Sequence, residues 1–213
     1  MLRLMKVGML AATLALLPAC ASSGGKGEAT GTSLGKAAAA IDSGQGQIDA
    51  ALAALGGLST AKGADLSSQF KVFQGALNQL ASTAKDVSGK AEAMQRDGQA
   101  YFADWDKDLA AISDEGVRSR SEHRRNEVQQ EFDAIAKRYQ EVAGEFKPFM
   151  ATLRDIETAL KADLTADGVK SLSSVIKRAT SEGGKVKASL TRLSKDFRSL
   201  SEKLAPAATA VGS

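Results

Sequence analysis

The residue with the most distinctive chemistry is Cys20, the only cysteine in a chain of 213 residues. It follows Leu17-Pro18-Ala19, so a branched side chain stands three positions before the thiol and a small one directly before it. This pattern is typical of a lipobox, in which bacteria lipidate the cysteine and cleave the chain in front of it. We therefore expect lipidation at Cys20. The alternative is an ordinary thiol in a signal peptide that is cut elsewhere.

The residues before Cys20 have the organisation of a signal peptide. Basic residues near the N-terminus precede an apolar run from 7 to 17, which is too short to cross a hydrocarbon core of roughly 30 Å as a helix. We expect a lipoprotein signal peptide over residues 1–19. Because Ala21 and not Asp follows the cysteine, the outer membrane is favoured over the inner one.

The segment that follows has the composition of a linker. Residues 20–35 contain mainly Ser, Gly, Thr and Ala, with few charges and no apolar period. This composition predicts a lipidated cysteine followed by a flexible tether, whose ~15 residues would hold the rest of the chain about 20 Å from the lipid. Acyl chains on the cysteine would anchor the protein to a bilayer without spanning it.

Arginine side chains gather in a second region with potential chemistry. They surround His123, the single histidine, and are Arg118, Arg120, Arg124 and Arg125. A guanidinium matches the oxygens of phosphate and carboxylate groups, so this cluster predicts a contact with an anion or an acidic partner. The alternative is a solvated basic turn near the start of a helix.

Acidic residues precede these arginines at Asp104, Asp106 and Asp108. Side chains two residues apart on a helix point about 200° apart, so these carboxylates do not converge on a cation. We expect them to pair with the arginines across a turn between two helices.

A second basic set lies in residues 167–204, which carry nine Lys and Arg against four Asp and Glu. Most of these charges fall outside the apolar positions of the segment. The candidate contact residues are Lys177, Arg178, Lys185 and Lys187. They predict either a solvated face or a contact with a membrane surface or a cell-wall polymer.

Composition and motifs argue against catalysis. One histidine and one cysteine cannot form a multi-histidine metal site or a paired-cysteine motif, and the sequence has no glycine-rich phosphate loop or nucleophile elbow. We therefore expect no enzyme activity, no cofactor and no metal. A net charge of +3 is too small to predict a nucleic-acid partner, because neutralising a phosphate backbone needs dense Lys and Arg.

Long helices must position these groups, because apolar residues return in alternating steps of three and four along most of the chain. The strongest series run from Leu66 to Ile112, from Val128 to Leu160 and from Val169 to Leu204, and a weaker one runs from Leu34 to Leu55. A repeat of about 3.5 residues predicts helices that pack in coiled-coil fashion. The second strong series continues through Pro148, where we expect a kink.

These series predict an all-α fold. We expect an elongated antiparallel up-down bundle, or coiled coil, of three long helices and a shorter N-terminal helix over residues 36–205, because short connections force neighbouring helices to run antiparallel. Residues 206–213 are expected to form a disordered tail.

The connections contain residues that stop and start helices. Gly56-Gly57 and Gly63 are expected to end the first helix, and Asp65 can cap the second. Ser119 with Glu122 fits a capping box for the third helix, and Thr165 or Asp167 can cap the fourth.

Several motifs between residues 101 and 204 resemble a bacterial family catalogued as domain of unknown function 2959. They are Phe102-Ala103-Asp104-Trp105, Val117-Arg118-Ser119-Arg120-Ser121, Phe132-Asp133, Phe146-Lys147-Pro148 with Arg154-Asp155, and Leu160 to Ala166. The family usually has His-Asn at Ala162-Asp163 and Asn at Thr165. The resemblance implies an all-helical envelope protein, often with a lipobox, and supplies no activity.

The predicted function follows from the anchor and the rod. We expect a lipoprotein of the outer membrane that faces the periplasm and acts as a structural or protein-interaction module of the cell envelope. Its expected partners are the membrane, through the acyl chains, and another envelope protein. The alternative is a protein that binds anionic lipid or a cell-wall polymer through a basic helix face.

Overall fold

The structure, a computed structural model, describes residues 22–61, 63 and 65–205. Its elements are α1 (Ser22–Thr60), α2 (Asp65–Ala111), α3 (Glu115–Ala162), α4 (Ala166–Ser171) and α5 (Ser173–Leu204). Within these ranges there is no strand, which confirms the predicted all-α fold. The predicted signal peptide, Cys20 and the tail over 206–213 lie outside the described residues.

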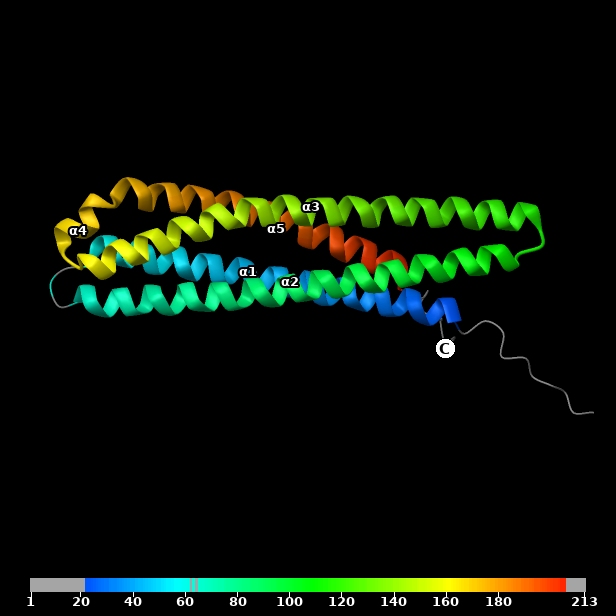
Figure 1. The fold of residues 1–213 in the computed structure, drawn as a ribbon, viewed down its shortest axis with the longest axis horizontal. Helices are drawn as coiled ribbons and strands as arrows, with labels where there is room; N and C mark the ends of the chain where they lie inside the picture. Colours follow the sequence, from blue (N-terminus) through cyan, green and yellow to red (C-terminus); the bar gives the residue numbers. More distant parts are fainter. Residues whose placement is uncertain (1–21, 62, 64, 206–213) are drawn as a thin grey trace, which may run out of the picture.

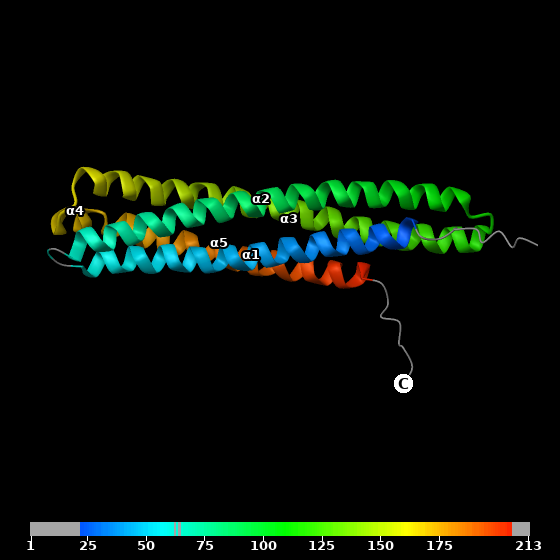
Figure 2. The ribbon, with the colours of Figure 1, turned by 90° about the horizontal axis from the view of Figure 1, so that it is seen from below.

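The four long helices form a rod in which neighbours run antiparallel (Figures 1 and 2). Around the rod the order is α1, α2, α3, α5, and α1 packs closely on both α2 and α5, whereas α2 and α3 pack most loosely. Helix α4 lies at one end, and the turn between α2 and α3 lies at the other (Figure 1). The predicted up-down bundle is therefore confirmed.

The core is built from the predicted apolar series. Every position of the four series is buried or partly buried. Phe73 of α2, Phe149 of α3 and Phe197 of α5 have no exposed surface, so each of these helices places an aromatic ring in the core. Burying such a side chain contributes roughly 1.5–3 kcal/mol, and this packing is the main source of helix stability.

The prediction of a flexible tether is wrong for residues 22–35, which are helical. Helix α1 has 39 residues and α5 has 32, so the N-terminal helix is not the short one. Small residues let α1 lie close to α5: the hydroxyl of Ser201 donates to the carbonyl oxygen of Gly31 at 2.7 Å, and a Cβ on Gly31 would lie 3.2 Å from the carbonyl oxygen of Ser201. The composition that resembled a linker serves close helix packing instead.

Two of the predicted helix boundaries are also wrong. The pair Gly56 and Gly57 lies inside α1, whereas Gly63, which was also predicted to end this helix, follows its last residue and is left-handed, with a φ of 57°. Asp65, the predicted cap, is the first residue of α2. Helix α3 begins before the predicted capping box, because the side chain of Asp114 accepts a hydrogen bond from the backbone N–H of Val117 at 2.8 Å.

The predicted cap at Thr165 is confirmed, since its hydroxyl accepts from the backbone N–H of Gly168 at 3.0 Å. The helix that it starts is short, however. Leu172 separates α4 from α5, so the last predicted helix is divided in two. Helix α3 continues through Pro148, and its yellow end slopes away from the line of its green part in Figure 1.

The close approach of α2 and α3 near Gly98 yields a testable prediction. A Cβ at this position would overlap the ring of Phe132, so Gly98→Ala should lower the free energy of unfolding by about 1–3 kcal/mol. The matched control is Gly75→Ala in the same helix, where a Cβ meets nothing within 4 Å and stability should rise by about 0.5–1 kcal/mol. Urea denaturation measures both, and equal effects would contradict the packing described.

Candidate interaction surfaces

The first candidate surface lies at the end of the rod where α2 turns into α3; we call residues 101–128 the hairpin end. Helix α1 begins and α5 ends before this turn is reached (Figure 1). Lys203, next to the last residue of α5, pairs with Glu131 of α3 at 2.6 Å. About 16 residues of α3, or roughly 24 Å of helix, therefore extend beyond the cover of α5.

An aromatic cluster forms the base of the hairpin end. The ring of Tyr101 lies 5.4 Å from that of Phe102 and 5.3 Å from that of Trp105, and Phe102 contacts Phe132 of α3 edge-on at 5.6 Å. Phe102 is buried, and the other two are partly buried against the core. Burial raises the pKa of Tyr101, and the positive charge of Arg124 partly offsets this rise.

Polar contacts join the two helices beside this cluster, and Leu109, farther out on α2, is still buried. The guanidinium of Arg125 lies over the ring of Phe102, 5.4 Å from its centre, and pairs with Asp106 at 2.8 Å. The indole N–H of Trp105 donates to the hydroxyl of Ser121 at 3.1 Å. The predicted pairing of acids and arginines across the turn is confirmed for Arg125, whose role here is to join α2 to α3.

The other predicted arginines have different surroundings. Arg118 and Arg120 are exposed, whereas Arg124 lies 3.6 Å from Glu127 on its own helix. Between residues 104 and 127, acidic side chains outnumber Lys and Arg by seven to five. The hairpin end is therefore of mixed charge, and the contact of Arg118, Arg120 and Arg124 with an anion or an acidic partner stays a prediction.

The second candidate surface is the outer face of α5. Lys177, Arg178 and Lys185 are exposed there, but Lys187 pairs with Asp49 of α1 and so joins two helices. Arg178 also lies 3.8 Å from Glu182.

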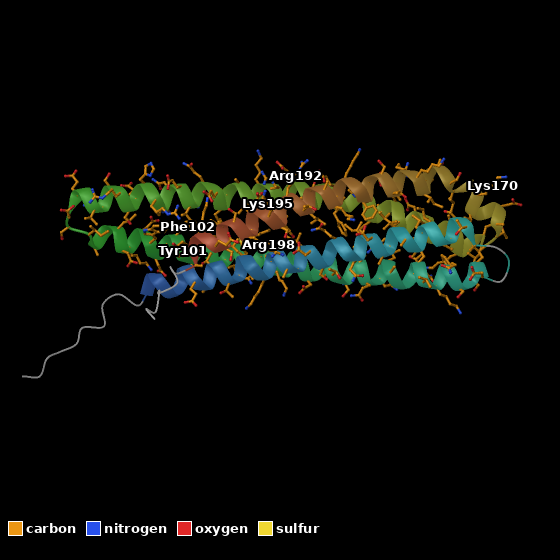
Figure 3. The ribbon with its side chains drawn as sticks, turned by 180° about the vertical axis from the view of Figure 1, so that it is seen from behind. Tyr101, Phe102, Lys170, Arg192, Lys195 and Arg198 are labelled. Carbon is orange, nitrogen blue, oxygen red and sulfur yellow. The ribbon has the colours of Figure 1, made fainter. Side chains whose placement is uncertain are left out.

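Sequence analysis missed two cations of this face, Arg192 and Lys195, which are exposed along α5 (Figure 3). The signal was present, because Lys185 and Arg192 are seven residues apart and so share one side of a helix. We call Lys177, Arg178, Lys185, Arg192 and Lys195 the basic face of α5.

The two predicted basic sets do not form one surface. The basic face of α5 runs along the side of the rod, and the hairpin end lies beyond the C-terminal end of α5 (Figures 1 and 3). No group of three or more His, Cys, Asp or Glu residues in the described part of the chain is arranged to hold a metal ion. None of the helices over residues 22–205 that the structure describes is long and apolar enough to cross a membrane.

Comparison with known proteins bears on the helices that build both surfaces. The model of the family described as protein of unknown function (DUF2959) matches residues 27–204, which include most of α1 and all of α2 to α5. The chain belongs to the DUF2959 family. No curated protein and no solved structure matches the chain. The resemblance seen in the sequence began at residue 101, and the match extends it to α1. The sequence analysis predicted a later start for this helix.

The contacts of Arg125 predict how the hairpin end of this DUF2959 protein responds to mutation. Arg125→Met removes the ion pair with Asp106 and the cation over Phe102, and should lower the free energy of unfolding by about 1 kcal/mol. Arg118→Met is the control, because this exposed side chain forms no ion pair within the described residues and its loss should change stability by less than about 0.5 kcal/mol. Urea denaturation compares the two, and equal losses would show that Arg125 contributes no more than a solvated arginine.

Proposed function

We propose that this DUF2959 protein is a lipoprotein anchored to the outer membrane through acyl chains on Cys20, and that it acts in the cell envelope as a structural or protein-interaction module without enzyme activity. The observation that carries the proposal is the continuous helical rod that begins two residues after the lipobox cysteine. Such a rod gives a lipid anchor a rigid element of defined length.

The geometry of α1 supports this proposal and changes its details. Two residues span at most about 7 Å, so lipid on Cys20 would be joined almost directly to the start of α1. A helix of 39 residues is about 58 Å long, so an anchored rod would hold α4 and the start of α2 at roughly that distance from the attachment point. The hairpin end would lie on the anchored side (Figure 1).

The two ends of the rod suit different partners under this proposal. The hairpin end, with its mixed charges and the half-exposed Val117, is available for contacts near the bilayer. The opposite end would contact a protein in the periplasm at a defined distance from the bilayer. A flexible tether, as predicted from the sequence, would not fix that distance. Because α1 packs on both α2 and α5, the anchored helix and the rest of the rod would keep a fixed position relative to each other.

Replacement of the lipobox cysteine tests the anchor. In a bacterial host, Cys20→Ser in the full chain should move the protein out of the outer-membrane fraction and remove the acyl modification from its mature N-terminus. Mass spectrometry of that N-terminus and membrane fractionation measure the two effects. Ser23→Ala is the control, and a wild-type protein that carries no acyl chain on Cys20 would sink the proposal.

A second candidate function is contact with anionic lipid or a cell-wall polymer, and the basic face of α5 favours it. Four of its five cations form no ion pair within the part of the chain that the structure describes: Lys177, Lys185, Arg192 and Lys195. Their spacing places positive charge along about 27 Å of one helix side, which suits an extended anion.

Vesicle binding tests this second function. The chain from Ala21 onward should bind vesicles that contain phosphatidylglycerol, and added salt should weaken binding because it screens exposed charges. The double variant Lys185→Glu with Arg192→Glu should reduce affinity about tenfold or more. Lys36→Glu with Lys71→Glu, on α1 and α2, is the charge-matched control. If both double variants lose affinity equally, net charge alone explains binding and the basic face has no specific role.

A further inference from the structure

A cavity of about 210 Å³ lies midway along the rod, between all four long helices. Its walls are apolar and include Ile41, Ile48, Leu80, Val142, Leu190 and Leu193. Interiors of proteins are normally filled to crystal-like density, with few voids larger than a water molecule. A space of this size among aliphatic side chains is large enough for part of an apolar ligand.

Small residues at one level of the rod create this space. Gly44, Ala84 and Ala143 line the cavity from α1, α2 and α3. At Gly44, a Cβ would find its nearest neighbour 4.0 Å away, so nothing crowds this side of the cavity. Ala143 of the cavity wall is also exposed, so the cavity is open to the surface at α3.

A surface groove of about 550 Å³ adjoins the cavity between α2 and α3. Ala84 and Phe146 line both spaces, so the Phe146 side chain stands between the interior and the groove. Its ring is only partly buried and lies 6.2 Å from that of Phe149. Met150 continues the apolar wall of the groove. The cavity and the groove therefore meet at Ala84 and Phe146.

Charged side chains border the groove. Lys85, Lys147 and Arg154 line the groove together with one acid, Asp155. Lys85 and Lys147 are exposed and form no ion pair within the described ranges. The border therefore has an excess of positive charge beside an apolar opening.

We propose that this cavity and groove bind a single-chain anionic amphiphile, with its alkyl chain in the cavity and its carboxylate or other acidic head at Lys85 and Lys147. The size agrees, because an apolar cavity of ~150 Å³ binds a molecule such as benzene, and 210 Å³ accepts part of an alkyl chain while the groove holds the rest. The charge of the border selects an acidic head over a neutral one. The site is independent of the anchor on Cys20 and of the basic face of α5.

Titration with decanoate and with decanol tests the site, since the two share a chain and differ in charge. The chain from Ala21 to Ser213 is used, because the helices that the structure describes begin at Ser22; circular dichroism confirms its helix content first. We expect decanoate to bind with one-to-one stoichiometry by calorimetry and decanol to bind more weakly.

A first pair of variants locates the alkyl chain of the bound molecule. Ala84→Leu fills the cavity and should abolish binding of both compounds, whereas Ala103→Leu, on an exposed side of α2, should not. If Ala84→Leu does not fold, Ala143→Met fills the same space from α3.

The paired variant Lys85→Glu with Lys147→Glu should weaken decanoate binding about tenfold or more and leave decanol unchanged. Lys71→Glu with Lys137→Glu, at two exposed lysines of α2 and α3, is the charge-matched control. Absence of decanoate binding to the wild-type chain, or decanoate binding that Ala84→Leu leaves intact, would overturn the proposal. Equal loss of decanoate and decanol in the lysine variant would show that the border does not recognise the head.

Discussion

The burial of one apolar stripe from each of four helices holds this structure together. The chain has a single cysteine, so no disulfide can form within it, and the rings of Phe73, Phe149 and Phe197 are instead completely covered by neighbouring helices. Isolated helices are marginal in water, so each long helix depends on the others to remain folded. Because the stripe returns every three and four residues, the helices can only be covered side by side, and the fold is a rod.

The functional proposals concern the places where the residues along this apolar stripe differ in size or polarity. In α1 small residues bring the backbone close to α5, and this helix begins at Ser22, two residues after Cys20. In the middle, Gly44 and Ala84 leave an apolar space that a larger residue would fill. At the hairpin end, the contacts of Ser121 with Trp105 and of Arg125 with Asp106 join α2 to α3.

The sequence predicted the features that depend on local periodicity. The apolar series of α2, α3 and α5, the cap at Thr165 and the pairing of Arg125 with Asp106 all involve residues that are close in the chain or in helical register. The start of α1 was missed because glycine and serine have low helix propensity, which packing against α5 and hydrogen bonds from Thr30 and Ser33 to Asp97 of α2 offset. The role of Lys187 was missed because its partner, Asp49, lies 138 positions away.

Small-angle X-ray scattering of the chain from Ala21 tests the rod most directly. Helix α3, with 48 residues, sets a length of about 72 Å, which gives a radius of gyration of about 22 Å. A compact globule of roughly 190 residues would have a radius of gyration of about 16 Å. We predict the larger value, with a distance distribution that extends past 70 Å as the length of α3 requires. A radius near that of the globule would contradict the packing of four long helices side by side.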